Sequence, residues 1–258
     1  MNDKFSFTRL GRVLGFYLPA MLRYGLWTGI IETLLYGIMV IGVLNDSIML
    51  PSTASNIFGY IVMYSGLIFL IYRDRTVALQ LPASHAERYV AVLLITIVII
   101  PLAVLVYFFF LECIAHICGL ETSVYQYLFD NGKAMLQEAN LGATMDDMIG
   151  FYSSWRAYPI VLVPILLVTY VSLASKRHRV VKAVVSPFIY NFAIGLVSGI
   201  IGVSKIVGKI KEGVDMKPDS DEIVTMTLNM LDFFVYVSIV ASVVLLVMLW
   251  RKIGRIQV

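Results

Sequence analysis

Six long runs of apolar residues dominate the chain, and polar residues collect between them. A helix needs about 17 to 25 such residues to cross the roughly 30 Å hydrocarbon core of a bilayer. The runs are continuous and do not alternate polar with apolar positions, so they do not fit the strands of a membrane barrel. The pattern predicts an all-α bundle of six transmembrane helices, at Tyr24 to Leu44, Asn56 to Tyr72, Tyr89 to Leu111, Tyr158 to Ala174, Ala183 to Val203 and Leu231 to Trp250.

The composition also indicates a polytopic membrane protein. Of the 258 residues, 59% are hydrophobic and 14% are charged, and the mean hydropathy is +0.84. A soluble domain carries about 25% charged residues. We therefore expect a single transmembrane domain over residues 1–258. The first twenty residues contain arginines and Pro19 and offer no small-residue cleavage site, so we expect no removable signal peptide.

Lysines and arginines are distributed unequally between the segments that connect the runs. Fourteen of the 20 lie in the N-terminal segment, in the connections after the second and fourth runs, and at the C-terminus, whereas six lie in the other connections. Because basic loops stay in the cytoplasm, we expect both termini on the cytoplasmic side of a bacterial inner membrane. The run Ser175 to Lys182 suits anionic lipid headgroups. Topology accounts for the basic residues, so we expect no nucleic-acid partner.

Two segments outside the runs have patterns of their own. Between Phe5 and Leu18, apolar residues recur at helical spacing opposite Arg9 and Arg12. This predicts an amphipathic interfacial helix within residues 1–20, which Pro19 turns into the first span; a disordered tail is the alternative. Residues 112–156 are expected to form a large extracytoplasmic loop, and its scattered apolar residues favour a small folded cap over a disordered loop.

A polar insert separates the second and third runs. Within it, Ser84 and Glu87 have the Ser-x-x-Glu spacing of a capping box, with Pro82 just upstream. In such a box the serine side chain accepts a hydrogen bond from the third helical N–H, and the glutamate accepts one from the N–H of the serine. We therefore expect the third span to begin here, after a short charged piece that lies along the membrane surface.

The stretch LPASHAERYVAVLL resembles the first intracellular loop of the membrane subunits of type-2 ATP-binding-cassette (ABC) exporters, which are six-span permeases. The amphipathic FSFTRLGRVL and the order of the six spans extend the resemblance. It implies that the loop docks on a separate ABC ATPase subunit, that the N-terminal helix is a connecting helix, and that a second permease subunit completes a homodimer or heterodimer. The matching positions are Leu81, Pro82, Ser84, Glu87 and Arg88, and Arg73, Asp74 and Arg75 flank them in the expected coupling loop. The alternative is an ordinary capping box at a cytoplasmic helix start.

Polar and small residues inside the runs are the other candidates. Glu32 stands within the first span, where a charge costs at least about 2.5 kcal/mol. It either lines a route or pairs across subunits, or it is a protonated or snorkelling structural residue. In GLVSGIIG, the spacing of Gly195, Gly199 and Gly202 allows helices to approach closely. Packing within the subunit is favoured there over a dimer contact.

The sequence contains no signature of catalysis. Cys113, His116 and Cys118 are too few and too awkwardly spaced for a structural zinc site, so we expect no metal and favour free thiols over a disulfide. No G-x-x-x-x-G-K-[ST] occurs, so ATP would be bound by a partner subunit and not by this chain. We expect no catalytic residue and no cofactor.

These observations favour a permease subunit of an ABC transporter, which moves a substrate across the inner membrane with energy from a separate ATPase. The alternative is a non-transporting membrane sensor, accessory or immunity protein that binds a partner through its outer loop. The sequence does not distinguish a lipid, a glycan, a peptide or a drug as the substrate.

Overall fold

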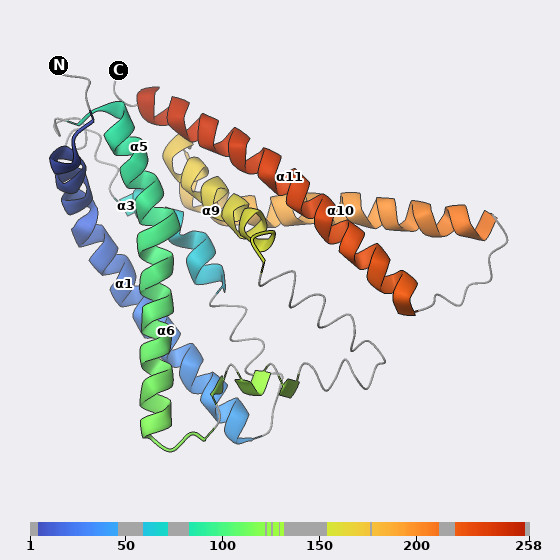
Figure 1. Ribbon diagram of the computed structural model, residues 1–258. Coiled ribbons are helices and arrows are strands. Elements are labelled where there is room, and N and C mark those ends of the chain that lie inside the picture. Colours follow the sequence, from blue (N-terminus) through green and yellow to red (C-terminus); the bar gives the residue numbers. More distant parts are fainter. Residues whose placement is uncertain are drawn as a thin grey trace.

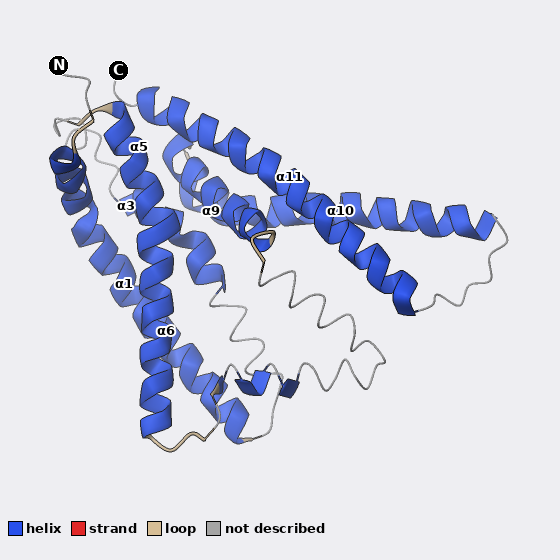
Figure 2. Ribbon diagram, viewed as in Figure 1, coloured by secondary structure: helices blue, strands red, loops and turns tan. Residues whose placement is uncertain are grey.

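The computed structural model describes residues 5–45, 59–71, 83–121, 123–124, 126–128, 130–131, 154–175, 177–211 and 220–255. Within these residues all regular structure is helical and no strand occurs (Figure 2). Five of the helices are long and apolar enough to cross a membrane. The chain is therefore an all-α, multi-pass membrane protein.

The first helix, α1, extends over Phe7–Leu44 and contains both the predicted interfacial helix and the first predicted span. Pro19 lies inside this helix and does not end it. Proline removes one backbone hydrogen bond and bends a helix, which the surrounding turns can absorb. Figure 1 shows the first turns of α1, in the darkest blue, at an angle to the rest of the helix. The predicted interfacial helix is thus not a separate element but the beginning of a helix about 57 Å long, at 1.5 Å per residue.

The third run forms one continuous rod of three labelled parts, which are α5 (His85–Leu93), the π-helical η2 (Leu94–Ile99) and α6 (Ile100–Ile117). Pro101 stands at the start of α6. Proline has no backbone N–H to donate to the preceding turn, and the wider π-helical turn accommodates this missing hydrogen bond.

The C-terminus of α6 corrects the expected boundary of the outer loop. Glu112 through Ile117 still belong to the helix, so the loop does not begin at Glu112. The helix ends at Ile117, and Gly119, two positions further on, has a φ of +99°. There the N–H of Leu120 donates to the carbonyl of Ala115 and the N–H of Gly119 donates to that of His116, which is the Schellman arrangement.

The second run is described only from Gly59 onward, as a shorter apolar helix that ends in η1 (Tyr64–Leu67) and α3 (Ile68–Ile71). Its expected beginning lies outside the described residues. Five of the six predicted spans are therefore found as long helices. At Gly66 this helix lies against α9 (Ala157–Ala174), because a Cβ on Gly66 would come within 2.6 Å of the backbone nitrogen of Thr169.

The last three helices pack against one another. Helix α9 contacts α10 (Arg179–Lys211) and α11 (Ser220–Arg255) more extensively than any other elements contact each other. Both long helices exceed their predicted spans, since α10 continues past Val203 and α11 begins before Leu231. In Figure 1 α10 extends away from the other helices.

Helix α5 stands between two groups of helices. One buried cluster contains Val92 of α5 and Ile95 of η2 together with side chains of α1, α3 and α6. Another contains buried side chains of α9 and α11, and Tyr89 and Leu93 pack against it. The starts of α1 and α5 and the end of α11 lie together at one end of the molecule (Figure 1). This gathering positions the candidate site.

Candidate functional site

The start of α5 is a complete capping box. The N–H of Glu87 donates to the Oγ of Ser84 over 3.3 Å, and the N–H of Ser84 donates to Oε2 of Glu87 over 2.7 Å. The helix start that the Ser-x-x-Glu spacing predicts is therefore confirmed at His85. These bonds satisfy two of the backbone donors that a helix start leaves free.

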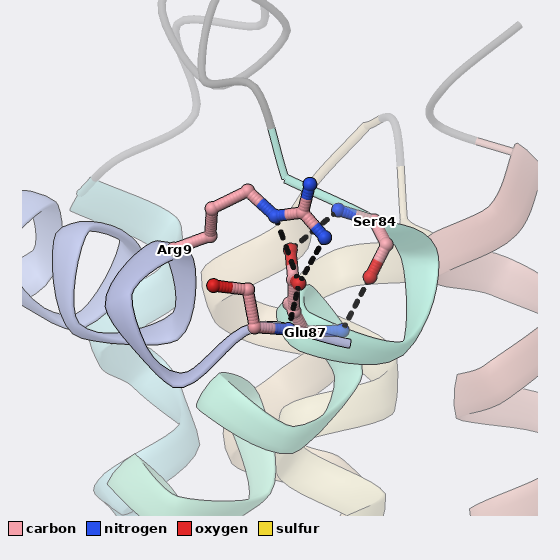
Figure 3. A network of polar contacts seen from close by, with 4 residues as sticks. Arg9, Ser84 and Glu87 are labelled. Atoms are coloured by element: carbon pink, nitrogen blue, oxygen red, sulfur yellow. Dashed lines mark hydrogen bonds and ion pairs between the residues drawn. The ribbon is translucent and has the colours of Figure 1, made fainter. Parts of the chain in front are cut away.

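The second oxygen of the same carboxylate holds the start of α1. Oε1 of Glu87 accepts a hydrogen bond of 2.7 Å from the N–H of Ser6, which is the N-cap residue of α1 and has no cap bond from its own side chain. Oε1 also accepts from Nε of Arg9 over 3.0 Å and lies 2.9 Å from Nη2 of Arg9. Figure 3 shows Arg9, Ser84 and Glu87 converging in this way. One carboxylate therefore joins the N-cap residues of two helices.

Electrostatics favour the ionised form of Glu87 in this position. Its side chain is 0% exposed, whereas that of Arg9 is 27% exposed. Burial by itself disfavours a carboxylate charge, but an adjacent guanidinium and several N–H donors favour it. The N-termini of two helices add positive partial charge on the same side. The ion pair is thus buried at its acidic end and open to solvent at its basic end.

The opposite side of α5 contacts the end of α11. The rings of His85 and Trp250 lie 4.0 Å apart, centroid to centroid, and Tyr89 meets Trp250 edge-on at 5.1 Å. The hydroxyl of Tyr89 donates to the carbonyl of Leu246 over 3.3 Å. A Cβ on Gly254 would lie 3.2 Å from Nε2 of His85, so the His85 ring packs against α11 at this glycine.

We call this group of contacts the helix-end junction, and it consists of Ser6, Arg9, Ser84, His85, Glu87, Tyr89 and Trp250. It ties the first turns of α5 to α1 on one side and to α11 on the other. A displacement of the chain just before Ser84 would therefore act on three long helices at once. Arg88 follows Glu87 in α5 and is half-buried. Two of the predicted coupling positions, Ser84 and Glu87, belong to the junction, and a third, Arg88, is adjacent to it in the chain.

The other predicted coupling positions are not placed by the structure. Arg73, Asp74, Arg75, Leu81 and Pro82 lie outside the described residues.

The glycine stripe does not make the expected contact within the described part of the chain. Gly195 and Gly199 are exposed on α10, and a Cβ at either position would meet no described atom within 4 Å. The side chain surroundings of Gly202 are not described. The close approach that a glycine does permit is at Gly66, against Thr169.

Glu32 is buried inside the first span, as its position in the sequence indicates. Its side chain is 1% exposed and, among the described residues, its Oε2 has no hydrogen-bond partner. It lines a groove of about 410 Å³ between α1 and the rod formed by η2 and α6. The far wall of this groove includes Ile99, Ile100 and Tyr107.

Cys113, His116 and Cys118 lie at the C-terminal end of α6. Cys113 and Cys118 are free and exposed, which agrees with the expectation of free thiols. His116 uses its Nδ1 within the helix end, 2.7 Å from the carbonyl oxygen of Leu120. No cluster of three or more metal-ligating side chains occurs among the residues that the structure describes.

Sequence reasoning found the capping box but missed the junction. Arg9 and Glu87 are 78 positions apart, and Tyr89 and Leu246 are 157 apart, so no local pattern connects them. The available signal was indirect: an arginine on the predicted amphipathic helix and a glutamate at a helix start on the same side of the membrane. Comparison of the chain with models of protein families, with curated proteins and with solved structures found no match.

Proposed function

We propose that the chain is the permease subunit of an ABC exporter, which resides in the inner membrane, pairs with a second permease subunit and is driven by a separate ABC ATPase. The observation that carries the proposal is the helix-end junction. In a subunit driven from outside, the element that receives the push has to be connected to the helices that move the substrate, and the junction supplies such a connection at Glu87 and at Trp250.

The route from the junction into the membrane supports the same proposal. The two helices that meet at Glu87 are α1 and the α5–η2–α6 rod. The same two helices form the groove beside Glu32. A change of angle between them at the junction changes the width of the groove deeper in the bundle. The chain itself has no ATP-binding motif, so ATP binding and closure of the partner subunits would bias the two arrangements.

The proposal is tested by purifying the tagged full-length chain from the membranes of its own host. The expected result is co-purification of a P-loop ATPase subunit whose association changes on adding a non-hydrolysable ATP analogue. Charge reversal of the coupling loop, Arg73→Glu with Arg75→Glu, is expected to abolish the association while the chain stays monodisperse. The matched control is Glu121→Gln with Arg156→Gln at the other end of the bundle, which leaves the association intact.

Two outcomes would contradict the proposal. One is a chain that purifies without any ATPase although it is folded and monodisperse. The other is an ATPase that is retained by the loop variant and lost from the control variant, since contact would then be made on the opposite side of the membrane.

A further inference from the structure

The groove between α1 and the η2–α6 rod is a candidate ligand site, and the coupling proposal does not say what it binds. Its volume of about 410 Å³ falls within the range of about 300 to 1,000 Å³ that is usual for small-molecule sites. Leu26 and Ile30 on its rim are 69% and 54% exposed. In a transmembrane helix such exposed apolar side chains face the acyl chains of the lipid. The groove therefore opens sideways, toward the hydrocarbon.

The hydroxyl groups that line the groove have already donated their protons. Thr33 donates to the carbonyl of Gly29 over 2.8 Å, and its Oγ1 lies 2.8 Å from the hydroxyl of Tyr107. Because a threonine hydroxyl has one proton, the Tyr107 hydroxyl is the donor in the second contact. The hydroxyl of Tyr24 donates to the carbonyl of Ile61 over 2.8 Å, and that of Thr28 donates to the carbonyl of Tyr24 over 3.0 Å.

The groove is consequently left with hydrogen-bond acceptors. The lining hydroxyls retain only lone pairs, and Glu32 in its ionised form adds a carboxylate oxygen, Oε2, that is buried and has no partner among the described residues. A buried acceptor without a donor is unfavourable, and a buried carboxylate charge without a counter-charge is more so. A ligand that supplies several N–H donors and a positive charge removes both penalties. An anion or a ligand that brings only acceptors would add to them.

We propose that this groove binds a hydrophobic molecule that carries a protonated amine, with the ammonium group on Oε2 of Glu32 and the apolar part along α1 and α6. An ammonium group has three donors and no acceptor, which matches the lining. Tyr24 and Tyr107 also line the groove, and aromatic rings attract cations. The inference concerns the chain alone and does not depend on an ATPase partner.

The test is photolabelling of the purified full-length chain in lipid nanodiscs at pH 7. Three diazirine probes with the same dodecyl chain are compared, and they end in an amine, an alcohol and a carboxylate. The amine probe is expected to label peptides of α1 and α6 at least about tenfold more than the other two, because a hydrogen bond to a charged group is worth more than a factor of ten in affinity. Excess dodecylamine removes the labelling and excess dodecanol does not.

Three variants make the test specific. Glu32→Gln removes the charge and is expected to lower amine labelling at least about tenfold. Glu112→Gln, the matched control, changes another buried glutamate on α6 that does not line the groove, and it keeps the labelling. Gly29→Leu fills the groove while Glu32 stays, since a Cβ at Gly29 already lies 3.8 Å from the ring of Tyr107. It is expected to abolish labelling.

Equal labelling by the three probes would overturn the proposal, because the groove would then recognise only the apolar chain. So would amine labelling that survives Glu32→Gln, or that Glu112→Gln removes. If Glu32→Gln is not monodisperse, the result with Gly29→Leu decides, and unchanged labelling of that variant refutes the site. The photolabelling experiment contains no ATPase. A negative photolabelling result therefore does not affect the co-purification result, and a negative co-purification result does not affect the photolabelling result.

Discussion

Replacing Glu87 is the sharpest perturbation of the helix-end junction. The Glu87→Gln variant keeps the shape of the side chain but has one carbonyl oxygen and one NH2 group in place of two acceptors. Both oxygens of Glu87 accept backbone N–H groups, at 2.7 Å from Ser6 and 2.7 Å from Ser84. Whichever way the amide is turned, its NH2 group faces a donor, so the cap of either α1 or α5 is lost.

The size of the effect follows from the bonds that are lost. A hydrogen bond to a charged group is worth about 1.5 to 3 kcal/mol, and loss of a helix cap costs about 1 kcal/mol. Arg9 is 27% exposed and can turn toward solvent, so the full cost of breaking a buried pair does not apply to it. We expect Glu87→Gln to lower the free energy of unfolding by about 3 kcal/mol.

The assay is unfolding of the purified chain in mixed micelles by increasing SDS, followed by circular dichroism. A double-mutant cycle with Arg9→Gln isolates the pair, and we expect a coupling energy of about 1 to 2 kcal/mol. Arg12→Gln, on an exposed position of the same helix, is the control and is expected to change stability by less than about 0.5 kcal/mol. A Glu87→Gln chain as stable as the original, or a coupling energy near zero, would refute the assignment of Glu87 as the shared cap of α1 and α5.

Two further predictions concern packing and topology. Gly66→Ala is expected to destabilise the chain by about 1 to 3 kcal/mol in the same assay, because its Cβ would overlap the backbone of Thr169. The control Gly37→Ala meets no described atom within 4 Å and should be neutral or slightly stabilising. Equal effects of the two substitutions would contradict the close helix approach. A membrane-impermeant maleimide should react with the exposed Cys118 from outside intact cells. In an otherwise Cys-free background, an Arg75→Cys variant should react only from the cytoplasmic side. The reverse pattern would overturn the predicted orientation.

Local patterns in the sequence predicted local structure well. Ser84 and Glu87 lie three positions apart, and their capping box forms as the spacing indicates because both partners are fixed by the same turn. The apolar run of the third span ends at Leu111, whereas the helix continues to Ile117. Gly119, two positions after the end of the helix, is the better signal, because only a residue that tolerates positive φ closes the Schellman arrangement there.

Contacts between distant segments were beyond the sequence. The glycines of α10 repeat at a spacing that permits close packing, yet Gly195 and Gly199 face no described neighbour. The single Gly66 has no repeat to reveal it, and its importance depends on Thr169, which belongs to another helix. Spacing shows that two helices are able to approach, whereas the partner surface decides whether they do.

The junction and the groove gain significance from lying on the same two helices. Arg9 is 23 positions before Glu32 on α1, and Glu87 is 20 positions before Tyr107 on the other rod. At 1.5 Å per residue, the junction and the groove are therefore about 30 to 35 Å apart along each helix. At that distance a rotation of about five degrees about Glu87 moves the facing side chains by roughly 3 Å, close to the length of a hydrogen bond. The bend around Pro19 and the π-helical turn at η2 are the places where the two rods can absorb part of such a rotation. A small angular change at the helix ends is therefore enough to make or break a contact with Glu32, provided that the rods remain tied at the one carboxylate that caps them both.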